Sequence, residues 1–236
     1  MRNLHTKSTP ERPILKSERS QSKWLCNVLI LKLDKCTLPY AIPSSILTCL
    51  KNLRELEVRD SDKVVSSCHH LTTLVHSAVS FCNLKQLSVK DCHGLKHLFT
   101  SSAARKLVHL EEMYIVQCES MEEILAEEQE ETTSGAIKFE RLSTIILDSL
   151  SSLLCFYSGS STLLLSTLIR VLIWKCPNMK TFSRGDIHAE SFLGIQGSLD
   201  TKEKLIFHQD LNSTVEQMFQ QQVRTLNQLI ITQVIL

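Results

Sequence analysis

Nine cysteines are the side chains of this 236-residue chain with the most chemistry to offer. Thiolates bind zinc and attack carbonyl carbons, and the histidines in Cys68-His-His70 and Cys92-His93 offer further ligands or a general base. A structural zinc site needs about four converging ligands, however, and the chain contains no C-x-x-C pair. The six glycines include no phosphate-cradling G-x-x-x-x-G-K-[ST] loop. We therefore expect no metal, no cofactor and no enzymatic activity.

Four cysteines share one setting, at the end of a mixed apolar pattern. In 83–99 the pattern is Leu84-x-x-Leu87-x-Val89-x-x-Cys92, continued by two further three-residue steps. A helix repeats apolar residues every three or four positions and a strand every second one, so this mixture indicates a short strand that turns into coil. A small thiol fits such a turn and is often buried. We predict a structural role for all four: Cys36, Cys92, Cys118 and Cys176.

The pattern occurs six times in one frame. Its central strand positions are Leu31, Leu56, Leu87, Met113, Ile145 and Val171, separated by 25, 31, 26, 32 and 26 residues. Repeats of this length and pattern are typical of leucine-rich repeats, which stack because no single repeat can bury its own apolar face. The predicted fold is an α/β leucine-rich-repeat solenoid. It has a curved parallel β-sheet on the concave side and irregular coil with short helices on the convex side.

Three regions are expected along the chain. Residues 1–24 are a poorly ordered polar leader, 25–183 form the repeat array, and 184–236 are degenerate or truncated terminal repeats with a short helix. Convex-side helices are predicted in 65–81 and, with a serine cap, in 101–109. Ser213-Thr-Val-Glu216 predicts a capping box. After it, Leu226-x-x-Leu229-x-Ile231 fits either another repeat strand or a continuing helix, and both remain open.

The residues between the inward strand positions face the concave side and are the candidate partner-binding residues. The first half of this row is charged and the second half is largely apolar, and apolar surface rimmed by charge suggests a protein contact. The candidates are Lys32, Glu57, Arg59, Lys90, Tyr114, Val116, Ile146, Leu172 and Trp174. The alternative is that these residues pack against another part of a longer protein.

The net charge and the cysteine content limit which class of partner and which cellular compartment we expect. The net charge of +1 gives no reason to expect nucleic acid, and the apolar runs are too short to span a bilayer. No secretory signal is visible. Thiols within apolar patterns, in odd number, indicate reduced cysteines and a cytoplasmic location.

Two stretches carry a family likeness. LKQLSVKDCHGLKHLFTSSAARKLVHLEEMYIVQCESMEEIL and IRVLIWKCPNMKTF resemble the C-terminal leucine-rich repeats of plant intracellular NLR immune receptors, the coiled-coil, nucleotide-binding disease-resistance proteins. The likeness covers roughly residues 28–220. It implies a defence role, in which the repeats sense a pathogen effector or a modified, guarded host protein, or contact the receptor's own nucleotide-binding domain. Because the phosphate loop is missing, the chain resembles a detached repeat region.

The sequence favours two other functions less. An F-box-type substrate receptor for ubiquitin ligation also carries cysteine-bearing leucine-rich repeats, and Leu38-Pro39 with Leu50 faintly resembles an F-box. An F-box would precede the array, however, and a repeat strand already lies before this segment. A cysteine hydrolase is disfavoured because the cysteines occupy core positions of the frame.

Overall fold

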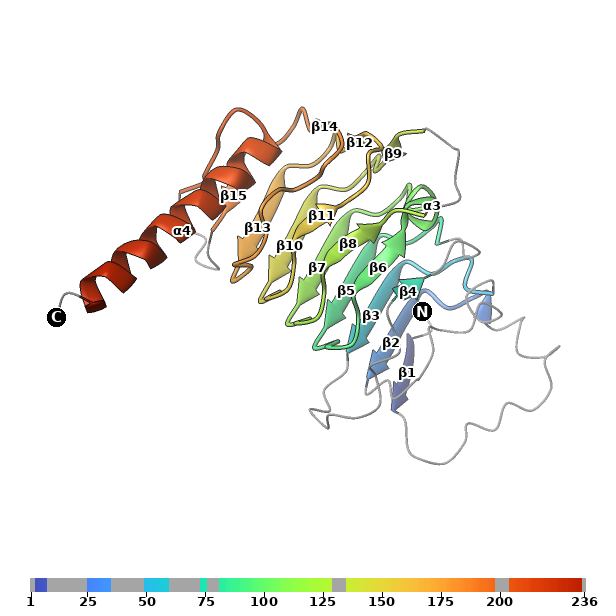
Figure 1. Ribbon diagram of the computed structural model, residues 1–236. Helices are drawn as coiled ribbons and strands as arrows, with labels where there is room; N and C mark the ends of the chain where they lie inside the picture. Colours follow the sequence, from blue (N-terminus) through green and yellow to red (C-terminus); the bar gives the residue numbers. More distant parts are fainter. Residues whose placement is uncertain are drawn as a thin grey trace.

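The computed structural model describes residues 3–7, 25–34, 49–59, 73–75, 81–128, 135–197 and 204–234. Its strands and helices are β1 (Asn3–Lys7), β2 (Ile30–Asp34), β3 (Glu55–Arg59), β4 (Thr73–Val75), β5 (Gln86–Lys90), β6 (His97–Thr100), α3 (Ser101–Ala104), β7 (Glu112–Val116), β8 (Glu123–Ala126), β9 (Ile137–Lys138), β10 (Thr144–Asp148), β11 (Cys155–Tyr157), β12 (Leu163–Leu164), β13 (Arg170–Trp174), β14 (Ile187–His188), β15 (Ile195–Gln196) and α4 (Leu211–Val234). Figure 1 shows them stacked side by side along one axis, with α4 at one end.

The architecture confirms the leucine-rich-repeat solenoid. Eight parallel strands form one long sheet in the order β1-β2-β3-β5-β7-β10-β13-β15. The central apolar positions lie in register from strand to strand, as Leu87 does with Met113 and Ile145 does with Val171. In β2, β3, β7 and β10 buried and more exposed residues alternate, because one face of the sheet packs into the core. Met113 and Ile115 of β7 are fully buried, and each such side chain contributes about 1.5–3 kcal/mol.

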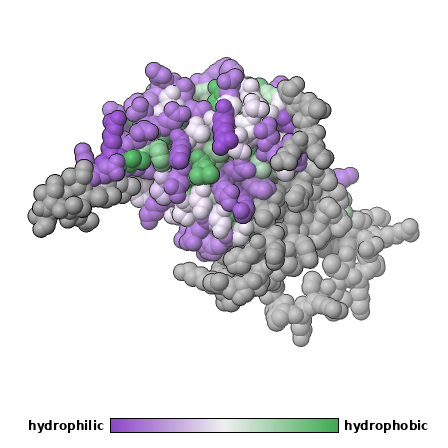
Figure 2. Space-filling view, in the orientation of Figure 1, coloured by the Kyte–Doolittle hydropathy of each residue, from purple (hydrophilic) through white to green (hydrophobic). Residues whose placement is uncertain are grey.

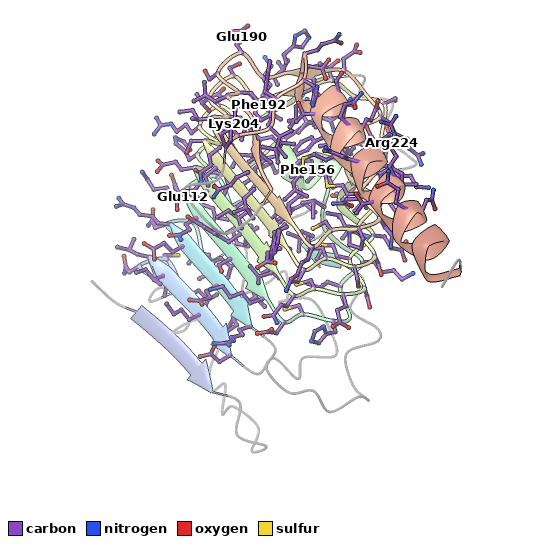
Figure 3. All side chains as sticks on the ribbon, turned by 90° about the vertical axis from the view of Figure 1, so that its left-hand side faces the viewer. Glu112, Phe156, Glu190, Phe192, Lys204 and Arg224 are labelled. Atoms are coloured by element: carbon purple, nitrogen blue, oxygen red, sulfur yellow. The ribbon has the colours of Figure 1, made fainter. Side chains whose placement is uncertain are left out.

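The opposite side of the array contains more strand than the sequence pattern indicates. A second parallel sheet has the order β11-β8-β6-β4, and a third has the order β14-β12-β9. The rings of Phe156 and Phe182, both fully buried, stack at 4.6 Å between neighbouring repeats. In Figure 3 Phe156 lies within the body of the array, whereas Glu112 and Glu190 are at its surface. The core is therefore enclosed by three sheets.

Four strands of the long sheet, β5, β7, β10 and β13, are each followed by a residue in the left-handed conformation. Asp91, Gln117, Ser149 and Lys175 have φ between 52° and 56°. The N–H of Gln117 donates to the carbonyl of Asp148 in the next repeat (2.9 Å), and Ser149 donates likewise to Trp174. The left-handed conformation is unfavourable for a residue with a Cβ, so the inter-repeat hydrogen bond helps to hold it.

Several local predictions are wrong in detail. Asn3–Lys7, predicted as part of a poorly ordered leader, form β1, which pairs in parallel with β2. Thr73–Val75, predicted within a helix, form β4 because they extend the sheet of β6. The helix at Ser101 has only four residues, and its cap is Thr100, whose Oγ1 accepts from the N–H of Ala103.

The C-terminal region resolves the choice between strand and helix in favour of a helix. Helix α4 runs for 24 residues, longer than the predicted short helix, and includes the Leu226 stretch. Its cap is Asp210 rather than Ser213: Asp210 Oδ1 accepts from the N–H of Ser213 (2.7 Å). The last strand of the long sheet is β15, which lies within the region predicted as degenerate or truncated terminal repeats and pairs in parallel with β13. Ile206 pairs antiparallel with Ile195 of β15.

Candidate functional site

The outer face of the long sheet, called here the open face, is formed by the side chains that alternate with the buried ones. In its middle row Tyr114 of β7 lies in register with Ile146 of β10, which lies in register with Leu172 of β13. In the next row Val116, Asp148 and Trp174 are aligned in the same way. Neighbouring strands are about 4.8 Å apart, so these side chains form a continuous surface.

The first half of the open face is an ion-pair network. Lys32 Nζ lies 2.7 Å from one oxygen of Glu57, and Lys90 Nζ lies 3.8 Å from the other. Arg59 Nε donates to Asp91 Oδ2 (3.1 Å). The charges predicted here as partner-binding therefore neutralise each other across strands β2, β3 and β5. Figure 2 shows that the surface in view is mainly hydrophilic, with small, separate apolar areas.

The Lys32–Glu57 pair predicts a pH effect on stability. The hydrogen bond from Lys32 holds the pKa of Glu57 below its ordinary value of 4.5. A carboxyl with a lowered folded-state pKa stabilises the protein above its unfolded pKa and loses that contribution as pH falls through the folded one. We expect Glu57→Gln to cost less than about 1 kcal/mol at neutral pH, because the pair is partly exposed. The cost should fade below about pH 4.5 in urea-unfolding measurements.

The matched control is Glu55→Gln, because Glu55 is exposed on the same strand. Its effect should be smaller than that of Glu57→Gln at neutral pH. A Glu57→Gln cost that grows as the solution is acidified would contradict the assignment of this pair as stabilising.

The second half of the open face is apolar and partly exposed at Tyr114, Val116, Ile146 and Trp174. Leu172 departs from the expectation of an exposed residue, because only 1% of it is accessible. It lies between Ile146 and Gln196, and Arg170, on the same strand, donates from Nη2 to Gln196 Oε1 (3.2 Å). Leu172 is therefore the floor of this surface rather than a contact residue.

Polar groups border the apolar half. The Tyr114 hydroxyl donates to Glu112 Oε2 (2.8 Å). Burial, and then this hydrogen bond, raise the pKa of Tyr114, so the phenol stays protonated and its ring orientation is fixed by Glu112. On the opposite edge Lys175 Nζ lies 6.0 Å from the centre of the Trp174 ring. The four partly exposed side chains thus form an apolar centre with a polar border.

Sequence reasoning missed Gln196 and Arg170, which border this surface. Gln196 lies on β15, whose repeat frame is reduced to Phe192-x-x-Ile195 and is followed by no cysteine turn. Gly194 occupies φ 141°, and a Cβ there would lie 2.8 Å from the carbonyl of Ile206. The Phe-x-x-Ile spacing was the available signal for this strand.

The four cysteines with a predicted structural role each follow a strand of the long sheet, and we call them the cysteine ladder. Cys92, Cys118 and Cys176 are at most 7% exposed, and Cys36 lies outside the described residues. The thiols of Cys118 and Cys176 donate to the carbonyls two residues before them, at 3.4 and 3.3 Å. Burial raises the pKa of Cys176 to about 12 and that of Cys155 to about 11. The thiols of Cys155 and Cys176 are therefore poor nucleophiles, because the thiolate form is disfavoured.

This burial predicts a wide spread of thiol reactivity. With a maleimide at neutral pH and no denaturant, we expect Cys118 and Cys176 to be labelled at least about 100-fold more slowly than the partly exposed Cys82, because attack requires opening of the core. Peptide mass spectrometry gives the rate at each site, and labelling in urea provides the unfolded reference. Labelling of Cys118 as fast as that of Cys82 would contradict the buried ladder.

Within the described residues no group of three His, Cys, Asp or Glu side chains is arranged to hold a metal ion, and Cys68–His70 lie outside those residues. No described helix combines the length and apolarity needed to cross a bilayer.

A family model matches residues 65–183, half of the chain; it describes the leucine-rich repeats of plant disease resistance proteins that are RPS2-like. No curated protein and no solved structure matches the chain. The matched region begins ahead of β4 and contains every strand that contributes to the apolar half of the open face except β15. The chain therefore belongs to the RPS2-like plant disease resistance family, as a leucine-rich-repeat region of a plant NLR.

Proposed function

We propose that the chain is a non-catalytic sensing module that binds a protein on the apolar half of its open face. The partner is a pathogen effector, a guarded host protein or the receptor's own nucleotide-binding domain, and binding takes place in the cytoplasm. The observation that carries the proposal is the contiguous patch of Tyr114, Val116, Ile146 and Trp174 with its polar border. Aromatic side chains in such a setting are the usual anchors of protein interfaces.

The charge distribution supports a protein partner over nucleic acid. The cations Lys32, Arg59 and Lys90 are each paired with a carboxylate of the same face. Nucleic-acid binding needs unpaired basic groups that release counterions from phosphates. The open face instead offers apolar area and neutralised charge, which favours protein surfaces of mixed polarity. The family membership does not favour the F-box alternative.

The test is capture from plant extracts with a specificity control. Tagged wild-type chain is compared with Tyr114→Ala/Trp174→Ala in leaf extracts from healthy and infected tissue, with quantitative mass spectrometry. A partner of the open face should be recovered at least about 10-fold less with the double variant, the usual effect of removing anchor residues. The matched control, Ile169→Ala, removes an apolar side chain that is 48% exposed outside the open face. Equal recovery with all three chains would contradict the proposal.

A further inference from the structure

Arg170, at the start of β13, differs from the other cations of the open face. The three cations of the charged half each lie within 3.8 Å of a carboxylate oxygen. The Arg170 side chain is exposed, and its Nη2 instead donates to the neutral amide oxygen of Gln196 (3.2 Å). Among the residues that the structure describes, no carboxylate forms an ion pair with Arg170. The apolar half of the open face is therefore bordered by a positive charge that its own carboxylates do not neutralise.

The two carboxylates on the strands of the apolar half accept hydrogen bonds from neighbouring hydroxyls. Glu112 accepts from the Tyr114 hydroxyl (2.8 Å), and Asp148 accepts from the Ser149 hydroxyl (2.8 Å). Burial and the hydrogen bond to Glu112 raise the pKa of Tyr114, and the positive charge of Arg170 opposes this rise. The guanidinium thus lies close enough to influence the aromatic part of the patch, although it is not paired with Glu112.

Gln196 holds the guanidinium in place and leaves its charge intact. Gln196 is only 5% exposed and lies in register with Leu172, the floor of the apolar half. Because an amide is uncharged, its hydrogen bond orders the Arg170 side chain without neutralising it. No described residue accepts from Nε or Nη1 of Arg170. An ordered guanidinium with donors to spare is suited to binding a carboxylate through two parallel hydrogen bonds.

We infer that the partner of the open face presents a carboxylate to Arg170, close to an apolar side chain that packs on Trp174. The inference rests on the proposed function, because it names the chemistry that the same surface recognises. Arg170 and Trp174 are four residues apart on β13, so their Cα atoms are separated by about 13 Å. An extended segment of the partner covers that distance in about four residues. Arg170 selects an acidic residue, and the apolar half supplies most of the contact area.

The experiment is selection of random peptides of about 12 residues, about 40 Å when extended, displayed on phage against the immobilised full chain. Wild type should enrich peptides in which Asp or Glu lies about three to five positions from an aromatic or large apolar residue. Arg170→Glu should enrich Lys or Arg at the acidic position, because the charge of the site is reversed. Tyr114→Ala/Trp174→Ala should enrich neither class.

Titration calorimetry with a synthetic copy of the most enriched peptide measures the contribution of Arg170. Arg170→Gln should raise the dissociation constant about 5- to 10-fold, and Arg170→Glu at least about 30-fold. Gln196→Glu should also weaken binding, because it supplies the missing carboxylate from within the chain. The matched control, Arg141→Gln, removes an exposed arginine that precedes β10 and should bind within about two-fold of wild type. Circular dichroism of each variant establishes that it is folded.

The outcomes separate this inference from the proposed function. If the peptides selected by wild type require Tyr114 and Trp174 but show no enrichment of acidic residues, the inference is overturned and the proposed function stands. It is also overturned if Arg170→Gln or Gln196→Glu binds as wild type does, or if Arg141→Gln loses as much affinity as Arg170→Gln. If wild type enriches no peptide, the inference fails, and capture from extracts decides the proposed function alone. Equal selection by Tyr114→Ala/Trp174→Ala contradicts both.

Discussion

Replacing Asn212 by alanine is expected to destabilise the protein by about 2–4 kcal/mol, because buried donors are left without acceptors. Asn212 lies in the first turn of α4 and closes the open edge of the second sheet. Its Oδ1 accepts from the backbone N–H of Phe182 (3.0 Å) and of Ser183 (2.9 Å) and from the Thr181 hydroxyl (3.0 Å). Its Nδ2 donates to the Ser183 carbonyl (2.9 Å). The Asn212 side chain thus makes the hydrogen bonds to residues 181–183 that a further repeat would otherwise make.

Urea unfolding at neutral pH measures the change in the free energy of unfolding. The matched variant Asn212→Asp keeps the acceptor and loses only the donor, so its cost should be smaller, about 1 kcal/mol. Hydrogen exchange localises the effect: the Phe182 and Ser183 amides should lose protection in Asn212→Ala, whereas the Ile145 amide in the middle of β10 should change only through global stability. Equal losses in the free energy of unfolding for Asn212→Ala and Asn212→Asp would contradict the role assigned to the Asn212 side-chain oxygen.

Most of the long sheet could be predicted from the sequence because its signal is local. Leu84, Leu87, Val89 and Cys92 lie within nine residues, and the same spacing recurs until Cys176. The side chains that point into the core can therefore be identified within each repeat. Aligning these positions gives the register between neighbouring strands. Beyond Phe182 the frame shrinks to Phe192-x-x-Ile195, and the edge is closed by a side chain about 30 residues further along, Asn212. Sequence periodicity does not reveal such long-range pairing.

The candidate surface could be predicted only in part for a similar reason. Alternation along each strand gives the direction in which Tyr114, Ile146 and Trp174 point, and the structure places them on one face. Exposure also depends on neighbours across the sheet. Leu172 is buried because its own strand is flanked by Ile146 and by Gln196, and Gln196 lies on a strand that the frame did not identify. The strand pattern therefore gave the direction of these side chains but not the burial of Leu172.

Trp174→Ala is expected to weaken binding of the partner captured on the open face by about 30- to 150-fold, the effect of losing an aromatic anchor worth about 2–3 kcal/mol. Trp174 is the largest side chain of the apolar half and lies in register with Asp148 at the end of β13. Because it is only partly buried, its removal leaves no cavity in the core, and the free energy of unfolding should change by less than about 1 kcal/mol. Affinity and stability should therefore separate.

Titration calorimetry with the purified partner, together with urea unfolding, measures both quantities. Leu172→Ala should show the reverse, because this fully buried side chain supports the surface from beneath: about 2–4 kcal/mol of stability is lost. Ile169→Ala should change neither strongly. If Trp174→Ala binds the partner as wild type does while Ile169→Ala does not, the partner binds the surface around Ile169 and the proposed role of the open face is wrong. If Trp174→Ala unfolds the protein, the residue is part of the core and the assignment of the open face fails.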